Sequence, residues 1–376
     1  MSSAPVDEPN ATRADDADDE EMLPRVQMTR RRFVLGCLLI LAVVALLYYG
    51  LPRLAGLDET WKRIERGDPW WLALALAFSA LSFGGYVVLF QYVYAEGGVR
   101  IGLRESYEIS MASLAATRIF AAGGAGGIAL TAWAMRRAGM ARRAVAERTM
   151  VFLVLTYVVY MVVMLVVGVG IRVGIFPGPA PFGLTVVPAA FAGISIALTL
   201  LLALTPTDLR RRVEGAAGGE GRLARFAARA ATLPATMSAA VRDSIDHARA
   251  RDPAILGSIA YWGFNIAVLW ASFKAFGAPP PWSVVVMGYF VGMLGNLLPL
   301  PGGVGGVDGG MIGAFIGFGV DDGLAVVAVP TYRAFAFWLP TIPGAIAFFQ
   351  LRRTVARWRE EREGERGRRP AAVAQA

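Results

Sequence analysis

The chain is poor in the residues that build disulfides and metal sites. It has one cysteine, Cys37, and one histidine, His247, among 376 residues. A single cysteine excludes an internal disulfide, and a single histidine argues against a histidine-based metal site. His247 falls in a polar segment, where we expect a solvated side chain. We therefore expect neither a bound metal nor another cofactor.

The chain also has few polar stretches long enough to fold as a separate soluble domain. Hydrophobic residues make up 56% of it, and apolar runs of about twenty residues recur, which is typical of transmembrane helices. No carboxylate pair, nucleophile–base arrangement or metal-ligand pattern is present. The sequence predicts an all-α, polytopic membrane protein that is not an enzyme.

Charge is unevenly distributed. The formal net charge is +8, yet residues 1–21 hold eight of the 29 acidic residues. We expect residues 1–28 to form a disordered acidic tail, and residues 352–376 to form a basic tail. Nucleic-acid binding could explain the basic excess, but the orienting effect of cytoplasmic arginines explains it better. We expect no nucleic-acid partner.

Hydropathy predicts six full spans within a transmembrane domain at 29–351. They lie at about 33–51, 71–94, 149–171, 185–204, 254–276 and 323–351. Arginines gather at 30–32, in the loop 205–253 and in the tail 352–376, and such segments stay in the cytoplasm. We therefore expect a multi-pass protein of the cytoplasmic (cell) membrane with both termini in the cytoplasm.

Two further apolar segments are interrupted by glycine. Residues 106–135 break at "AAGGAGG" (121–127), and residues 282–319 break at "NLLPLPGGVGGVDGG" (296–310). Each reads as a re-entrant helical hairpin, the first entering from the cytoplasm and the second from outside. Repeat one (71–171) and repeat two (254–351) then share one pattern in opposite orientations. Inverted repeats with broken helices are typical of transporters.

The second break offers backbone amides at the start of a short helix, which can bind a phosphate. The amides concerned are those of Gly302, Gly303, Gly305 and Gly306. The later glycines, Gly309, Gly313 and Gly317, continue a four-residue spacing that favours close helix packing.

Charged residues near the breaks are the other candidates for a binding site. Arg333 lies ten residues into the last predicted span, where a charge costs roughly 3 kcal/mol unless it faces protein or water. It could be a structural partner of Asp308 or of carbonyl groups, or it could bind phosphate together with Arg118. Asp308 could instead carry a proton, although the partner role fits better.

Four secondary candidates complete the predicted site. Glu147 and Arg148 stand at the cytoplasmic start of a span, where they could lock the hairpin, guard a head-group entrance or anchor the interface. Asn296 could hydrogen-bond at the second break. Tyr332 precedes Arg333.

The second break also resembles a known family. "LPLPGGVGGVDGGMIGAFIGFGV" (298–320) and "YRAFAFWLPTIPG" (332–344) are similar to the signature of the lysylphosphatidylglycerol synthase transmembrane region, a flippase-like family. Matching residues are Pro299, Pro301, Gly302, Gly303, Gly305, Tyr332 and Arg333, with Asp308 in place of the family's glutamate. Arg118, "GGAGG" and Glu147–Arg148 match more loosely. The resemblance covers about residues 30–350 and implies lipid translocation. It does not imply synthase activity, because no soluble aminoacyl-transfer domain is recognisable.

The expected function is therefore translocation of an anionic lipid or lipid-linked intermediate through a midplane cleft between the repeats. The partner would be a membrane phospholipid or a polyprenyl-phosphate lipid, and a soluble or membrane partner enzyme is compatible with this role. One alternative is a membrane-embedded enzyme or accessory subunit that handles a lipid-linked sugar or aminoacyl group and uses Glu147 and Asp308. The other is a permease for small solutes or ions.

Overall fold

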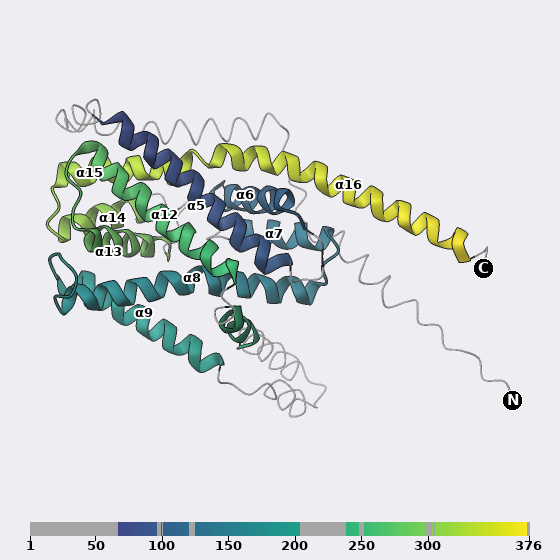
Figure 1. Ribbon diagram of the computed structural model, residues 1–376, viewed down its shortest axis with the longest axis horizontal. Coiled ribbons are helices and arrows are strands. Elements are labelled where there is room, and N and C mark those ends of the chain that lie inside the picture. The colour runs from purple at the N-terminus through teal and green to yellow at the C-terminus, as the bar shows by residue number, and fades with distance from the viewer. Residues whose placement is uncertain are drawn as a thin grey trace. The chain divides into compact units, whose positions relative to one another are not determined.

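The computed structural model describes residues 67–95, 99, 101–119, 125–203, 238–247, 252–297, 303 and 305–373. The predicted acidic tail and the predicted first span lie outside these residues. Throughout the described part, all regular structure is helical (Figure 1). The all-α fold class is confirmed.

Within the described part, five helical stretches are long and apolar enough to cross a membrane. They are α5 (Pro69–Ala95), α8 (Arg142–Arg172), α9 (Phe182–Ala203, of which Phe182–Leu201 qualifies), α12 (Pro253–Phe276) and the stretch Asp322–Glu361. Each overlaps one of the predicted spans. Local sequence defines the start of α12. Asp252 caps this helix by accepting a 2.7 Å hydrogen bond from the amide of Ala254. Pro253 occupies the first helical position, where a backbone N–H would have no partner within the helix.

The last predicted span is not a continuous α-helix. It consists of α15 (Asp322–Arg333), the π-helical segment η4 (Ala334–Trp338) and α16 (Thr341–Val373). The predicted span over 323–351 lies within the membrane-length stretch Asp322–Glu361, whose helix is interrupted because Pro340 cannot donate a helical hydrogen bond. α16 also runs on through the segment predicted as a basic tail.

Both predicted hairpins are pairs of short helices. The first pairs α6 (Leu103–Ile119) with α7 (Ala125–Arg137), and the second pairs α13 (Trp282–Met293) and the 3₁₀ turn η2 (Leu294–Leu297) with α14 (Gly306–Gly317). At 1.5 Å per residue, α13 and α14 are each ~18 Å long, well short of a ~30 Å hydrocarbon core. These lengths favour re-entrant arms, and the side from which each hairpin enters stays a prediction.

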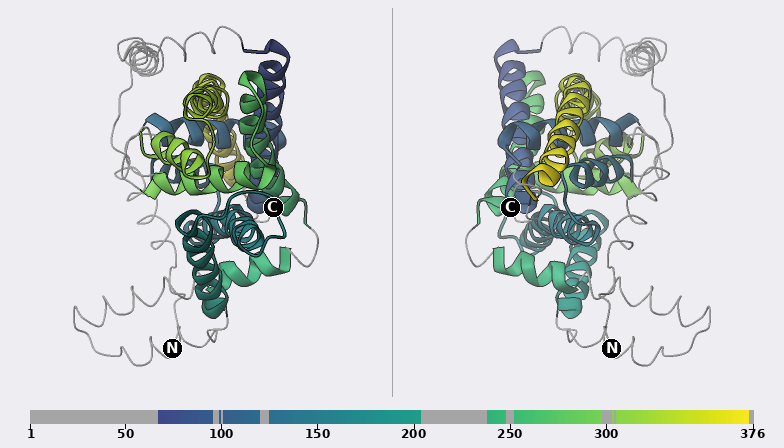
Figure 2. Two further views of the ribbon diagram at one scale, coloured as in Figure 1. Left: turned by 90° about the vertical axis from the view of Figure 1, so that its left-hand side faces the viewer. Right: turned by 90° about the vertical axis from the view of Figure 1, so that its right-hand side faces the viewer.

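The two repeats are joined by a close contact between α5 and α12, which lie side by side in Figures 1 and 2. Gly85 and Gly257 make this approach feasible. A Cβ built on Gly257 would lie 2.6 Å from the amide nitrogen of Leu89 and 2.7 Å from the carbonyl oxygen of Gly85. Small residues that let two backbones meet are typical of membrane helix pairs.

The hairpins pack in a reciprocal way. α6 of repeat one lies against α16 of repeat two, and α13 of repeat two lies against α8 of repeat one. Two repeats related by a two-fold axis would show such contacts in pairs, because α6 corresponds to α13, and α8 corresponds to the last span, to which α16 belongs. The contacts therefore support the predicted symmetry.

The glycines of α14 do not all pack as expected. Gly310 approaches Gly292 of α13, where a built Cβ would lie 3.3 Å from the carbonyl oxygen. Gly309 and Gly313, by contrast, have no described neighbour within 4 Å of a built Cβ. The prediction of a packing ridge at these two positions was wrong, because the row that includes Gly310 faces α13 instead.

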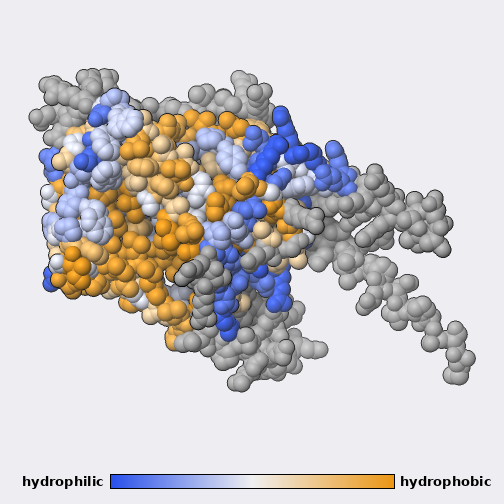
Figure 3. All heavy atoms as spheres, viewed as in Figure 1, coloured by the Kyte–Doolittle hydropathy of each residue, from blue (hydrophilic) through white to orange (hydrophobic). Residues whose placement is uncertain are grey.

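The surface of the described helices suits a lipid environment. Figure 3 shows apolar residues covering the middle of the helices and polar residues gathered towards their ends. Large apolar side chains are exposed on α8, α9 and α12, including Val166, Ile194 and Leu256. Buried polar contacts then hold the helices together, as when Ser258 donates a 2.8 Å hydrogen bond to the carbonyl of Leu155.

Candidate functional site

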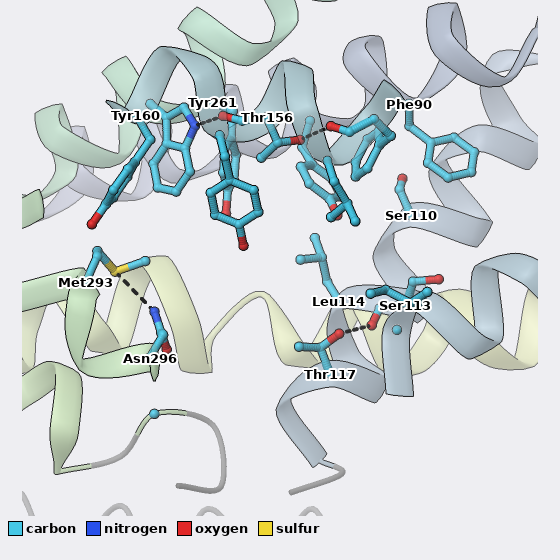
Figure 4. Close-up of a pocket in the computed structure, with 18 of the residues that line it drawn as sticks. Phe90, Ser110, Ser113, Leu114, Thr117, Thr156, Tyr160, Tyr261, Met293 and Asn296 are labelled. Carbon is cyan, nitrogen blue, oxygen red and sulfur yellow. Dashed lines mark hydrogen bonds between the residues drawn. The ribbon is translucent and has the colours of Figure 1, made fainter. Parts of the chain in front are cut away.

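A cavity of about 610 Å³ lies between elements of both repeats. This volume is in the usual range for small-ligand sites. Repeat one supplies residues of α5, α6, α7 and α8, and repeat two supplies residues of α12, η2, α15 and η4. Figure 4 shows Tyr160 and Tyr261 on one side of this space, with Asn296 and Thr117 facing them from the other. The cavity therefore depends on the assembly of the two halves.

Arg118, at the end of α6, lines the cavity and binds the broken helix of the other repeat. Its guanidinium donates hydrogen bonds to the carbonyl of Ala336 at 3.2 Å, to the hydroxyl of Thr341 at 3.2 Å and to the carbonyl of Phe337. Among the described residues it forms no ion pair with a carboxylate. Arg118 thus brings a positive charge to the cavity that no described acid neutralises.

The acceptors exist because the helix is irregular there. Pro340 has no N–H, so the carbonyl of Ala336, four residues earlier, loses its helical donor. The amide of Leu339 bonds the carbonyl of Ala334, a π-type step, at 2.8 Å. Ser79 of α5 donates to the carbonyl of Phe335 at 2.8 Å. Side chains of repeat one therefore donate hydrogen bonds to backbone carbonyls of repeat two that lack a helical donor. In apolar surroundings such carbonyls need a partner.

Arg333, at the end of α15, also lines the cavity and forms a buried ion pair. Its Nε lies 2.9 Å from Asp308 Oδ1, and the two side chains are 4% and 11% exposed. The other oxygen of Asp308 accepts a 3.0 Å hydrogen bond from the amide of Gly305 at the start of α14. Asp308 therefore holds both the helix start and the arginine.

Phe337 lies close to both guanidinium groups. The Cζ atoms of Arg118 and Arg333 lie 4.6 Å and 4.0 Å from the centre of its ring. Cation–π attraction at these distances offsets part of the cost of holding two like charges together. Two guanidinium groups and one carboxylate leave an excess positive charge at this end of the cavity.

The structure places the other predicted residues unevenly. Asn296 and Gly303 line the cavity with Arg118 and Arg333. Gly303 and Gly305 have positive φ angles of 67° and 81°, which favour glycine. Gly305, Gly306 and Asp308 do not line the cavity, and Gly302 lies outside the described residues.

Three secondary candidates do not line the cavity. Glu147 forms an exposed ion pair with Arg143 at 2.8 Å, and Arg148 binds Asp243 at 3.0 Å. Tyr332 is buried and hydrogen-bonds Asn265 at 3.4 Å. These contacts engage all three residues away from the cavity.

The solvated position expected for His247 was wrong. Its side chain is 5% exposed, and its Nδ1 lies 3.0 Å from Asp252 Oδ2. Asp252 also caps α12. The residue appears in a polar stretch of sequence, but the helix at 238–247 packs it against the start of α12.

Sequence reasoning missed the aromatic lining and Glu108. Tyr86, Phe90 and Tyr94 recur every four residues along α5, so they share one face, and all three line the cavity. Glu108 of α6 is 1% exposed and accepts a 2.6 Å hydrogen bond from Thr354 of α16. The four-residue aromatic spacing was a usable signal, and so was an acid within an apolar arm.

Helical spans, paired short helices and a cationic cavity define a multi-pass helical membrane protein with an internal polar site. The chain belongs to the family described as the lysylphosphatidylglycerol synthase TM region, whose model matches residues 33–344. The predicted family is confirmed. The family name associates this membrane protein with a lipid-related function.

Curated relatives match over a shorter stretch. Two proteins from Methanothermobacter thermautotrophicus, each described as a UPF0104 membrane protein, are 34% identical over 90 residues and 33% identical over 91 residues. Each match covers 24% of this chain, and 27% and 26% of the two relatives. The chain therefore matches about a quarter of the length of these relatives.

Proposed function

We propose that this protein translocates an anionic lipid between leaflets, with the phosphate of the lipid bound beside Arg118 and Arg333. The observation that carries the proposal is the cavity between the repeats, to which each repeat contributes one guanidinium group. Buried arginines bind phosphate with strong, directional hydrogen bonds. An anion there would balance the excess positive charge.

The remaining lining favours a lipid over a small ion. Apolar side chains such as Leu114, Leu153 and Phe191 line the same space as the arginines. A hydrated ion gains little from such surroundings, whereas the first carbons of an acyl chain are stabilised there. Rocking of the repeats about the α5–α12 contact would expose the bound phosphate to each leaflet in turn, as in other inverted-repeat carriers.

We further propose transport without chemistry as the activity. Glu147 is bound to Arg143 at the protein surface, and Asp308 is bound to Arg333. Neither arrangement supports an acid–base pair within the cavity. The enzyme alternative would require those two carboxylates to meet at one substrate.

The proposal is tested with full-length protein in proteoliposomes that contain a trace of fluorescent phosphatidylglycerol. A membrane-impermeant reductant quenches only the outer leaflet, so translocation appears as additional loss of fluorescence. We expect wild-type protein to move the lipid. Arg118→Lys keeps the positive charge but loses the planar guanidinium group, which can bind a phosphate with two hydrogen bonds at once. We expect this variant to translocate the lipid about tenfold more slowly than the wild-type protein.

Arg143→Lys is the matched control, because Arg143 lies in an exposed pair away from the cavity. It should transport at the wild-type rate. Thermal unfolding of each variant separates a folding defect from a transport defect. Wild-type protein that leaves the inner-leaflet lipid in place, or a folded Arg118→Lys variant with full transport, would overturn the proposal or its site.

A further inference from the structure

Apart from its two guanidinium groups, the cavity is rich in aromatic rings and hydroxyl groups. Tyrosines reach it from three different helices: Tyr86 from α5, Tyr157 from α8 and Tyr261 from α12. Thr117 and Thr156 add aliphatic hydroxyls. A site for an acyl chain alone would have no use for so many hydroxyls.

Several of these hydroxyls are available to a ligand. Tyr94 and Tyr160 already bind protein, to the hydroxyl of Thr149 at 3.0 Å and to the carbonyl of Phe290 at 2.7 Å. In contrast, the phenolic groups of Tyr86, Tyr157 and Tyr261 have no hydrogen-bond partner within the described part of the chain. All three side chains line the cavity, and Tyr157, which is 50% exposed, stands at its more open part.

The threonine and serine hydroxyls offer mainly acceptors. Thr117 donates to the carbonyl of Ser113 at 2.9 Å, and Thr156 donates to the carbonyl of Phe152 at 2.7 Å. A hydroxyl that donates one hydrogen bond still has lone pairs that can accept another. A ligand bearing O–H donors would match these acceptors and the free phenols together.

Charge argues against an amino group in the same place. Among the described lining residues there are two arginines and no aspartate or glutamate. Arg333 is paired with Asp308, so an ammonium group would meet the positive charge of Arg118, which no described acid neutralises, and like charges at short range are strongly disfavoured where water is scarce. The cavity is thus built for donors that carry no charge.

We propose that the cavity selects a lipid whose phosphate carries an uncharged, hydroxyl-rich headgroup, such as a sugar, an inositol or a glycerol. This inference rests on the proposed function and names the class of its substrate. The arginines hold the phosphate, the tyrosine rings pack on the C–H face of the polyol, and the hydroxyls bind its O–H groups. Aminoacylated and amine-containing headgroups are rejected by charge.

The test measures binding of defined lipids to purified full-length protein by native mass spectrometry. Phosphatidylinositol and phosphatidylglycerol carry a polyol, whereas phosphatidylethanol has the same charge and no polyol. We expect the two polyol lipids to bind about fivefold more tightly than phosphatidylethanol, which corresponds to about one net hydrogen bond. Lysyl-phosphatidylglycerol and phosphatidylethanolamine should bind at least about tenfold more weakly than phosphatidylglycerol.

Variants then locate the selectivity. The double variant Tyr157→Phe and Tyr261→Phe keeps both rings, so it should bring the ratio of phosphatidylglycerol to phosphatidylethanol affinity close to one while phosphatidylethanol affinity is unchanged. Tyr92→Phe, on the exposed side of α5, is the matched control and should keep the ratio. Unfolding temperatures verify that the variants are folded.

Failure of this inference differs from failure of the proposed function. Equal binding of phosphatidylethanol and phosphatidylglycerol, with labelled phosphatidylethanol moved in proteoliposomes, would overturn the headgroup selectivity and leave translocation standing. Tighter binding of phosphatidylcholine than of phosphatidylglycerol would also overturn the headgroup selectivity. It would show that the aromatic rings bind a cationic headgroup. Absence of movement for every lipid would overturn the proposed function itself.

Discussion

The ion pair between Arg333 and Asp308 is nearly sealed from water, so its two partners depend on each other. Removing one partner of a buried pair leaves the other charge without compensation, which costs roughly 3–5 kcal/mol. We expect Arg333→Ala to lower the stability of the detergent-purified protein by about this amount. A thermal unfolding curve measures it as a clear drop in the midpoint.

The exposed pair of Arg143 and Glu147 is the control for this measurement. Its side chains are 75% and 41% exposed, and such pairs contribute about 0–1 kcal/mol. Arg143→Ala should therefore leave the midpoint almost unchanged. Equal losses for both variants would show that Arg333 is not held in a desolvated pair.

Glu108 gives a second test at a single residue, one that the sequence had not singled out. The hydroxyl of Thr354 donates to this buried carboxylate at 2.6 Å and so joins α6 to α16. Hydrogen bonds to charged groups contribute about 1.5–3 kcal/mol, and we expect Thr354→Val to cost a similar amount in chemical unfolding. Within the described residues the hydroxyl of Thr331 bonds only the carbonyl of Val327 in its own helix, and Thr331→Val should cost much less. A similar cost for both would contradict the link.

At the scale of elements, the contact of α5 with α12 is set by glycine. Gly257→Ala places a methyl group against backbone atoms of α5 that cannot move aside, and overpacking of this kind costs about 1–3 kcal/mol. Gly263, in the same helix, has no described neighbour within 4 Å of a built Cβ. Gly263→Ala should be neutral or slightly stabilising in the same unfolding assay. Comparable effects at both positions would refute the close approach.

The sequence predicted most of these elements, and it failed where tertiary contacts decide. Hydropathy and glycine clusters located the helices and both hairpins, because apolar length and helix breakers are local properties. The irregular backbone of η4 was not predicted, since neither Pro340 nor the apolar run reveals that Arg118 will bind the carbonyls of this segment. That contact joins residues more than two hundred positions apart in the chain, beyond the reach of any local pattern.

At the scale of the whole molecule, the packing of repeat one against repeat two explains why Arg118 and Arg333 reach one cavity. Arg118 bonds the carbonyls of η4, and Arg333 directly precedes η4, so this contact between the repeats brings the two charges together. Glu147 and Arg148 could not be excluded from the cavity by sequence alone, because the face of α8 they occupy is set by its packing. A family resemblance is equally silent on that orientation.

Inverted insertion of the repeats gives the last prediction, which concerns the side of the membrane that each hairpin faces. The turn before α8 follows the first hairpin and the turn before α15 follows the second, so the two turns should lie on opposite sides. In a Cys37→Ser background, Asp322→Cys should react with an impermeant maleimide on intact cells. Arg142→Cys should react only after permeabilisation, because both positions are exposed in the structure and only the membrane can separate them. Labelling of both from the same side would exclude opposite insertion, and with it a cavity that opens to the two leaflets in turn.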